Sequence, residues 1–279
     1  MGKIVGLLLV ILAVASIWMF VGQHTWWFPH NISEHGVAID AQFNRTLVVV
    51  GIAFTLAQLA LGYAVVRFGR RGNDRAVYTH GSNKLEVTWT LITAVVFVLL
   101  AVLGQKVWAD LHLHSAPDGA VKVEVVAQQF QFNFHYAGKD GVFGHTDPKY
   151  MDDSALNYVG LDPGDPNAKD DVQLTTLVIP ENRPVELTLK SKDVIHSFFV
   201  PALRFKQDTV PGLAIKVHFT ALEKGRFEIP CAELCGQLHS TMKGNLIVVS
   251  GEDYDAMAAM TEEKFKDRMA ELLQQYPSQ

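Results

Sequence analysis

The residues best suited to chemistry lie in one short segment near the C-terminal end of the chain. Within twelve residues this segment contains two cysteines, Cys231 and Cys235, followed by His239 and Met242. Thiolate, imidazole and thioether groups are ligands that suit copper. The segment lies between two stretches with the composition of β-strands, so we expect it to form a loop. These residue types at this spacing predict a copper site.

The second cysteine distinguishes this group from a site for one blue copper ion, which takes one thiolate, two imidazoles and a weak axial ligand. Two thiolates can instead bridge two copper ions, and each ion then needs an imidazole of its own. His239 is one such imidazole, and the best candidate for the other is His196, at the end of a predicted strand. The alternative is a disulfide between Cys231 and Cys235, which an outward-facing domain would permit. A disulfide would leave the histidine and the methionine of the loop without a purpose.

Three long stretches of the chain contain no charged residue. They are residues 4–23, 46–66 and 87–105, of 20, 21 and 19 residues, and about 20 apolar residues cross a bilayer as a helix. Between the second and third stretches, residues 67–86 carry four arginines and a lysine against two acidic residues. Basic loops of this kind lie on the cytoplasmic side. The sequence therefore excludes a soluble cytosolic protein and predicts a transmembrane helical hairpin over 44–108, with the polar remainder on the outer side.

The first apolar stretch allows two interpretations for residues 1–23. The small residues Ala13, Val14 and Ala15 offer a cleavage pattern, which favours a signal peptide. Trp26 and Trp27 follow at the place of an interfacial aromatic belt, which favours an additional transmembrane helix. We favour the cleaved signal and keep the additional helix as the alternative.

From residue 120 the hydrophobic residues alternate with polar ones, a period typical of β-strands. The run from Val121 to Val125 and the run from Phe130 to Tyr136 have opposite parity, which predicts one strand with a bulge near 127–129. Proline and glycine separate the further strand-like runs, which are 175–179, 185–189, 214–219, 226–229 and 245–249. Several short strands of this kind predict a β-sandwich or a small Greek-key barrel.

The end of the chain and the overall composition add further limits. After residue 250, methionines, a phenylalanine and a leucine recur at near-helical spacing, which predicts one amphipathic helix over 251–279. The net charge of −5 argues against nucleic acid as a partner. With two cysteines in 279 residues, a disulfide-rich scaffold is excluded, and the absence of Cys-x-x-Cys-His means that no haem c is attached to this chain.

The order of these motifs resembles subunit II of cytochrome c oxidases of the haem–copper type. The resemblance covers residues 44–250, with the helical hairpin, the aromatic strand, Asp193-Val-x-His196-Ser, the Asp-x-Val-Pro-Gly motif of 208–212 and the cysteine loop in family order. It implies a membrane-anchored all-β protein, in which the transmembrane hairpin precedes a cupredoxin-like Greek-key β-barrel over 120–250. That barrel carries the binuclear copper centre called CuA.

The resemblance also implies the role of each residue in the copper site. Cys231 and Cys235 resemble the bridging thiolates, and His196 and His239 resemble the terminal imidazoles. Met242 matches the weak axial ligand of the copper that His196 binds.

Glu233 has two matches in the family. Its backbone carbonyl matches a ligand of the copper that His239 binds, and its side chain is similar to a carboxylate that reaches a magnesium or manganese ion shared with subunit I. The function implied is to accept electrons from cytochrome c and pass them to haem in subunit I, where oxygen is reduced to water. This chain would then hold no catalytic residue of its own. The implied location is the bacterial inner membrane, with several crossings and with the copper domain on the periplasmic or extracellular face.

Three further matches lie outside the copper ligands. Phe130 takes the place of the tryptophan at which electrons enter, although an aromatic ring there also packs the barrel. Asp193 matches an acid that docks cytochrome c. Glu86 occupies a position similar to the one that marks the mouth of a proton path into subunit I. Asn83 and Glu86 are also spaced as a helix capping box.

An acidic segment separates two of the predicted strands. Residues 140–171 contain eight aspartates against two lysines. Such a segment could attract a basic cytochrome c over long range, or it could be a flexible, solvated insertion. The sequence does not favour either interpretation.

Two alternative functions fit the same residues. A copper-containing nitric oxide reductase would use a similar CuA subunit, and its catalytic partner would distinguish it. A membrane-anchored copper carrier would use exposed ligands and release its metal to a chelator. A quinol oxidase subunit is disfavoured, because it lacks the copper ligands.

Overall fold

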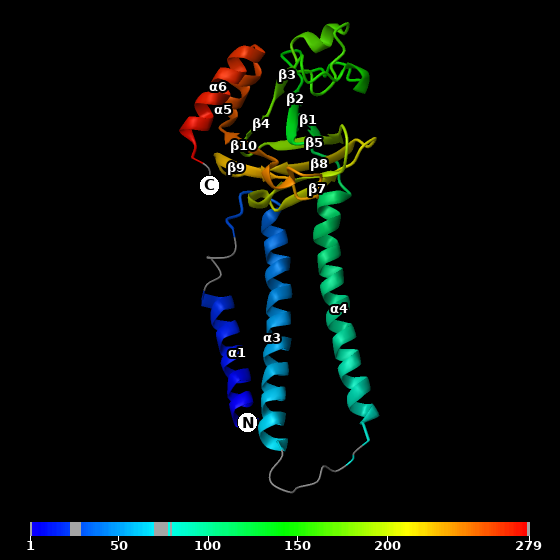
Figure 1. The fold of residues 1–279 in the computed structure, drawn as a ribbon, viewed down its shortest axis with the longest axis vertical. Helices are drawn as coiled ribbons and strands as arrows, with labels where there is room; N and C mark the ends of the chain where they lie inside the picture. Colours follow the sequence, from blue (N-terminus) through cyan, green and yellow to red (C-terminus); the bar gives the residue numbers. More distant parts are fainter. Residues whose placement is uncertain (1, 23–28, 70–77, 79, 278–279) are drawn as a thin grey trace. The chain divides into compact units, whose positions relative to one another are not determined.

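The computed structural model describes residues 2–22, 29–69, 78 and 80–277. These residues form two compact units (Figure 1). The first unit comprises Met1–Pro29 and Ala38–Asp110, and the second comprises His30–Val37 and Leu111–Gln279. We describe them in turn as the helical unit and the β unit.

The helical unit is built from three apolar helices, α1 (Gly2–Gly22), α3 (Gly36–Phe68) and α4 (Asn83–His112). Each is long and apolar enough to cross a membrane, and most of their large apolar side chains are exposed, as lipid-facing side chains are. α3 and α4 extend beyond the predicted hairpin of 44–108 at both ends. α1 covers most of residues 1–23 and fits both of the predictions for that segment.

The β unit contains ten strands, which confirms the predicted all-β class. They are β1 (Val121–Gln128), β2 (Gln131–Tyr136), β3 (Val172–Leu174), β4 (Thr176–Pro180), β5 (Pro184–Ser191), β6 (His196–Val200), β7 (Phe205–Thr209), β8 (Ile215–Thr220), β9 (Gly225–Pro230) and β10 (Lys243–Val249). Five strands form one sheet in the order β3-β2-β1-β5-β8, three form a second in the order β4-β10-β9, and β6 pairs with β7. The fold is cupredoxin-like, but its sheets stay open and do not close into the predicted barrel.

Apolar side chains fill the space inside the β unit. β1 alternates buried and less buried residues at its start, and the fully buried aromatic residues Phe132, Phe134 and Phe198 belong to the same core. Tyr136 links the two larger sheets, since its hydroxyl donates to the Val178 carbonyl at 3.0 Å and accepts from the Val178 N–H at 2.7 Å. Burial raises the pKa of Tyr136 well above its usual value, so this tyrosine is a neutral structural residue.

The change of parity predicted as a bulge is instead a hairpin. β1 and β2 are antiparallel, with Gln128 opposite Gln131, and only Gln129 and Phe130 lie in the turn between them. Because the turn reverses the chain, both runs place their apolar side chains in the same core. The prediction of a single bulged strand was therefore wrong. We call residues 129–130 the β1–β2 turn.

The acidic segment between β2 and β3 is held together by its own carboxylates. Seven of its eight aspartates accept backbone N–H groups, namely Asp140, Asp147, Asp152, Asp162, Asp165, Asp170 and Asp171. The eighth, Asp153, pairs with Lys192. Two short 3₁₀ helices, η1 (Pro148–Tyr150) and η2 (Pro166–Lys169), form within it. Most of these hydrogen bonds join residues within the acidic segment, so its carboxylates hold its own backbone.

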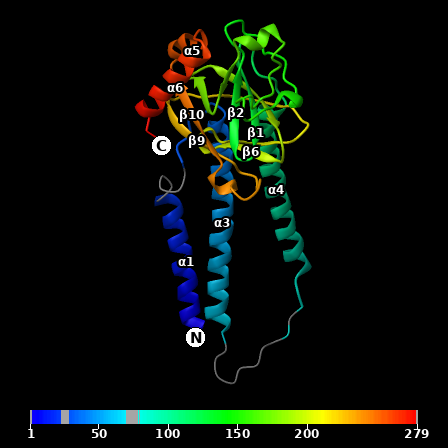
Figure 2. The same cartoon turned by 45° about the horizontal axis from the view of Figure 1, so that its top comes forward.

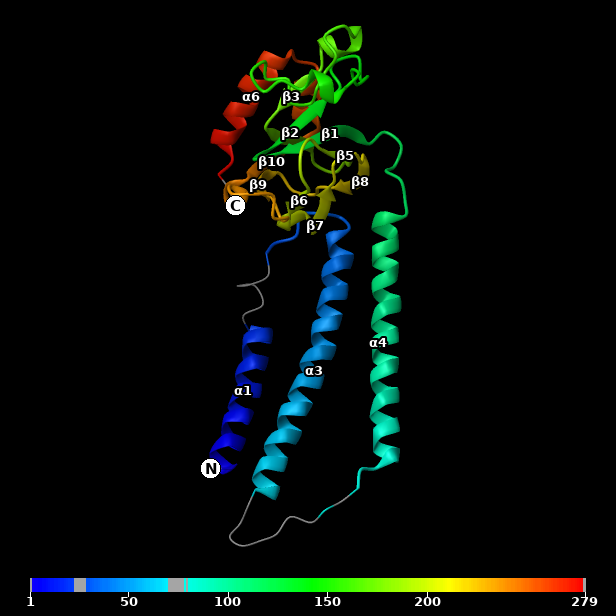
Figure 3. The ribbon, with the colours of Figure 1, turned by 45° about the vertical axis from the view of Figure 1, so that its right-hand side comes forward.

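The C-terminal segment forms two helices, α5 (Gly251–Ala258) and α6 (Glu262–Gln275), where we predicted one. The Ser250 side chain accepts the Asp253 N–H and so begins α5, and α6 begins after Thr261. Both helices bury apolar residues against the β unit, among them Met257 and Phe265. Figure 3 shows α6 beside the acidic segment.

A short segment before α3 also belongs to the β unit. The N–H of Ile32 donates to the Ala202 carbonyl, and the carbonyl of Ile32 accepts the Leu222 N–H. Ile32 is almost fully buried. The predicted boundary at residue 120 therefore leaves out residues 30–37 of this unit.

Candidate metal centre

The predicted copper ligands come from two places in the β unit. His196 is the first residue of β6, and the other ligands lie in the loop between β9 and β10 (Figure 2), which contains the 3₁₀ helix η4 (His239–Thr241). We call residues 231–242 the copper loop. Backbone hydrogen bonds join its ends, since the Cys231 N–H donates to the Met242 carbonyl at 3.0 Å. The Ala232 N–H donates to the Ser197 carbonyl at 3.1 Å, which fixes the loop beside β6.

The two cysteine sulfurs lie close together without forming a disulfide. Their Sγ atoms are 3.9 Å apart, whereas a disulfide bond is about 2.05 Å long. Both cysteines are free thiols. The disulfide alternative is therefore wrong for this structure.

Each sulfur has an imidazole of its own beside it. The Nδ1 atom of His196 is 4.0 Å from the Cys231 sulfur, and the Nδ1 atom of His239 is 3.6 Å from the Cys235 sulfur. The Met242 sulfur lies 3.7 Å from the Cys235 sulfur. The five side chains predicted as copper ligands thus lie close together. The Glu233 carbonyl oxygen also belongs to the group, at 3.3 Å from the Cys231 sulfur.

Most of these side chains are sheltered from water. His196 is fully buried, and Cys231, Cys235 and Met242 are buried as well, while His239 is half-buried. Burial, together with the neighbouring Cys231 sulfur, raises the pKa of the Cys235 thiol to about 11. A bound cation would reverse this effect, because metal binding favours the thiolate.

Asp193 orients the imidazole of His196. Its Oδ1 atom lies 2.8 Å from Nε2 of His196, which leaves Nδ1 facing the sulfurs. Burial raises the pKa of Asp193, but hydrogen bonds from the Gln129 N–H, from His196 and from the Val194 N–H outweigh this effect and lower it. A carboxylate on the far nitrogen of a metal-binding histidine fixes the ring and its tautomer.

The donor set fits copper. His196, Cys231 and Cys235 bring their ligand atoms within 4.8 Å of one another. Among the residues that the structure describes, they are the one group of three or more His, Cys, Asp or Glu side chains that does so. The two sulfurs are 3.9 Å apart, and a metal–sulfur bond is about 2.3 Å long. One metal ion can therefore contact both sulfurs. Soft sulfur ligands combined with imidazole select copper over magnesium or calcium.

The other predicted site residues lie at different places. Phe130 is half-buried in the β1–β2 turn and packs on the core, next to the copper loop. The side chain of Glu233 is exposed. Glu86 lies in the helical unit, in the first turn of α4, where its N–H donates to the Ser82 carbonyl at 3.0 Å. Asn83 is the first residue of α4, so it does not occupy the cap position that the capping-box interpretation requires.

Sequence reasoning missed Gln129. Its side-chain amide donates to the Cys235 carbonyl at 2.6 Å, and its backbone N–H donates to Oδ2 of Asp193 at 2.8 Å. No motif signals this role, because a glutamine in a turn is common and its partners lie far away in the sequence. The position of Gln129 beside the aromatic strand is the only hint that the sequence offers.

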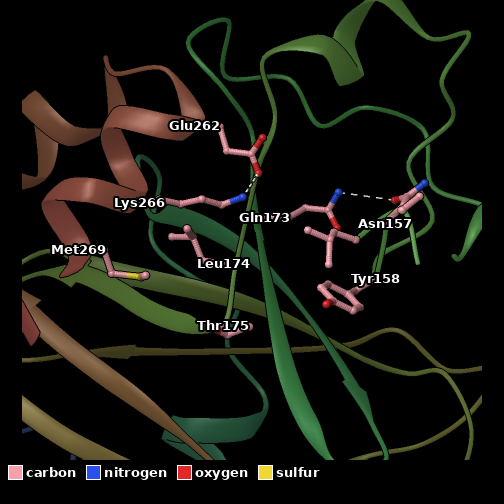
Figure 4. Close-up of a pocket in the computed structure, with 10 residues that line it drawn as sticks. Asn157, Tyr158, Gln173, Leu174, Thr175, Glu262, Lys266 and Met269 are labelled. Atoms are coloured by element: carbon pink, nitrogen blue, oxygen red, sulfur yellow. Dashed lines mark hydrogen bonds and ion pairs between the residues drawn. The ribbon is translucent and has the colours of Figure 1, made fainter. Parts of the chain in front are cut away.

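A separate cavity of about 550 Å³ lies between the acidic segment, β3 and α6. Figure 4 shows Tyr158, Gln173, Leu174 and Met269 around it, with Lys266 paired to Glu262. None of the predicted copper ligands lines this cavity. It therefore does not belong to the metal centre.

Comparison with known proteins identifies the family of this chain. The profile of the family described as cytochrome c oxidase subunit II, periplasmic domain, matches residues 121–251, and the profile of the transmembrane domain matches residues 23–107. The alternative cytochrome c oxidase subunit 2 of Bradyrhizobium diazoefficiens is 34% identical over 254 residues, covering 90% of each chain. Cytochrome c oxidase subunit 2 of Synechocystis is 29% identical, covering 92% of this chain and 82% of the relative.

The crystal structure of the periplasmic domain of subunit II of cytochrome oxidase from Bradyrhizobium japonicum is 23% identical, with a TM-score of 0.39. The match covers 54% of this chain and 99% of the chain in that crystal structure.

The fold and the site together define a membrane-anchored cupredoxin-like protein with a cysteine- and histidine-rich copper site. The chain belongs to the cytochrome c oxidase subunit II family. It is the CuA-domain subunit through which electrons enter a haem–copper oxidase, and its family profile places the β unit in the periplasm.

Proposed function

We propose that the copper loop and His196 hold two copper ions in one CuA centre. The observation that carries this proposal is the pairing of each sulfur with a different imidazole, Cys231 with His196 and Cys235 with His239. His239 does not join the group of three ligands within 4.8 Å, which supports two separate terminal positions. Met242 and the Glu233 carbonyl would complete the two coordination shells.

The protein's part in electron transfer is to keep this ligand set unchanged. When bound, a pair of copper ions would supply a centre that takes up and releases one electron. Cys231 and Met242 are tied by backbone hydrogen bonds, and Asp193 fixes the ring of His196. A buried and tied site reorganises little, because neither water nor loose side chains respond to the change in charge. The burial of the ligands also argues against the copper-carrier alternative.

The surface of the copper loop supports a partner subunit. Leu234 is 79% exposed and Leu238 is 54% exposed, and exposed apolar side chains beside a functional site mark an interface. We assign this surface to the haem-bearing subunit I, which would reduce oxygen to water. The exposed carboxylate of Glu233 would reach the magnesium or manganese ion shared with that subunit.

The electron donor that we propose is cytochrome c. It would dock beside the β1–β2 turn, where Phe130 would receive the electron and Asp193, with a side chain 30% exposed, would contribute negative charge. The acidic segment would add long-range attraction for a basic cytochrome c, and its Asp153 pairs with Lys192, the neighbour of Asp193. Glu86 would mark a proton path at the cytoplasmic side of the bacterial inner membrane.

Copper content and spectrum of the purified oxidase test this function. We expect two copper ions in this subunit and electron paramagnetic resonance hyperfine coupling shared equally by both nuclei. Replacing Cys231→Ser or Cys235→Ser should remove the shared coupling, because a hydroxyl does not bridge copper ions as a thiolate does. Ser240→Ala, in the same loop, is the control and should leave the spectrum unchanged. An isolated copper signal that survives both cysteine variants would refute the proposal.

A further inference from the structure

We infer that Gln129 is a positioning residue of the copper centre. This inference rests on the proposed function. This residue touches no predicted ligand atom, but its side chain bonds to the backbone of Cys235 and its N–H bonds to Asp193, which contacts His196.

The first connection is made by the side chain of Gln129. Its Nε2 atom donates to the backbone carbonyl of Cys235 at 2.6 Å, the shorter of the two hydrogen bonds that this residue makes to the site. The carbonyl belongs to the residue that carries one of the two sulfurs. A shift of this carbonyl would therefore move the Cys235 sulfur relative to Cys231 and His239.

The second connection is made by the backbone of Gln129. Its N–H donates to Oδ2 of Asp193 at 2.8 Å, and Oδ1 of the same carboxylate lies 2.8 Å from Nε2 of His196. Gln129 thus acts on His196 through Asp193. One residue is connected to the cysteine on the copper loop and to the histidine on β6, which lie far apart in the sequence.

The close approach at Gly236 completes the arrangement. A Cβ atom added to Gly236 would lie 2.8 Å from Nε2 of Gln129 and 3.2 Å from two ring atoms of Phe130. The absence of a side chain at 236 therefore lets the β1–β2 turn rest directly on the copper loop. A side chain at position 236 would therefore compete with the Gln129 amide for the place from which it donates to Cys235.

The test uses the intact oxidase with Gln129→Ala and with Gln129→Glu, which has nearly the same shape but no amide donor. Residues that support metal ligands without binding the metal typically change affinity by 10–100-fold when replaced. We expect copper loss to a water-soluble copper(I) chelator to be about tenfold faster in both variants, with a shifted midpoint potential of the copper signal. Gln131→Ala is the matched control, because Gln131 lies in the same hairpin but bonds only to Asn133 among the described side chains. It should leave both quantities unchanged.

The outcomes separate this inference from the proposed function. Rates and potentials of Gln129→Ala and Gln129→Glu equal to those of Gln131→Ala would overturn the positioning role, whatever the number of copper ions. A wild-type spectrum from one isolated copper would instead refute the binuclear centre before any variant is compared. A purely structural role would reduce the amount of assembled oxidase but would not move the potential of the assembled fraction.

Discussion

Gly236 controls how closely the β1–β2 turn approaches the copper loop. Its φ of +137° is a conformation that glycine adopts more readily than other residues. Gly236→Ala should therefore strain the backbone by about 1–3 kcal/mol and push the amide of Gln129 away from Cys235. We expect a lower midpoint of thermal unfolding together with faster copper loss, measured on the purified oxidase.

Gly119 provides the control for this substitution. It also has a positive φ, +80°, but nothing lies within 4 Å of an added Cβ atom. Gly119→Ala should lower stability through backbone strain and leave copper loss unchanged. Equal rates of copper loss in the two alanine variants would show that contact at Gly236 has no effect on the centre.

At the residue scale, the sequence predicted candidate ligands but not the residues that hold them in place. Cys231, Cys235 and His239 share one loop, so their spacing alone suggests a common metal. Gln129 is joined to Cys235 across 106 positions, and no local pattern encodes such a contact. Asp193 was matched to a docking acid, and the structure adds its hydrogen bonds to His196 and Gln129.

At the scale of elements, a buried ion network joins the acidic segment to the large sheet. His135 on β2 is fully buried, with Nε2 2.6 Å from Asp171 and Nδ1 3.0 Å from Glu124. Glu124 also pairs with Lys190 of β5 at 2.6 Å. Asp171 in turn accepts the N–H groups of Gly138 and Gly144. The network therefore connects the sheet to both ends of the acidic segment.

This network predicts a pH-dependent stability. Burial lowers the pKa of His135, but hydrogen bonds to Asp171 and Glu124 outweigh it and raise the pKa above 6.5. Burial likewise raises the pKa of Glu124, but bonds from His135 and Lys190 lower it below 4.5. The stabilisation that His135 contributes is complete below pH 6.5 and is lost as the pH rises through the raised pKa of His135. The stabilisation that Glu124 contributes is complete above pH 4.5 and is lost as the pH falls through the lowered pKa of Glu124. Both contributions are present between about pH 4.5 and 6.5.

His135→Gln tests this dependence, because glutamine carries no charge in either state. At pH 5.5 we expect the variant to lose about 3 kcal/mol of unfolding free energy, measured by urea denaturation of the purified chain in detergent. The loss should become smaller as the pH is raised towards 9. His145→Gln, at an exposed position of the same segment, is the control. A loss that stays constant from pH 5.5 to 9 would contradict the charged state of His135.

The elements themselves were predicted unevenly. The apolar helices follow from composition alone, and most strands follow from alternation. The β1–β2 hairpin was missed because its two-residue turn, Gln129–Phe130, contains no glycine, proline or asparagine to signal a reversal. The parallel pairings of β1 with β5 and of β4 with β10 depend on contacts between distant segments, which periodicity does not encode.

At the scale of the whole molecule, the part of the helical unit that contains α3 and α4 is flanked in the sequence by two parts of the β unit. Residues 30–37 and those from 111 onward both belong to the β unit, while α3 and α4 connect the two ends. A pair of membrane-crossing helices returns the chain to the side on which it started. Because basic loops are cytoplasmic, we predict that the arginines between α3 and α4 stay in the cytoplasm.

Reporter insertions test this orientation in cells. Alkaline phosphatase is active only outside the cytoplasm. Green fluorescent protein fluoresces only when it stays in the cytoplasm, because it does not become fluorescent when it is exported in unfolded form. We expect phosphatase activity from a reporter placed after Gln275 and fluorescence from one placed after Gly72. Replacing Arg70, Arg71 and Arg75 with glutamate should reduce both signals, because the positive charges retain this segment in the cytoplasm, whereas lysine at the same positions should preserve them. Phosphatase activity at Gly72 in the unaltered chain would contradict this orientation. It would place the copper site on the cytoplasmic side, where a periplasmic electron donor could not reach it.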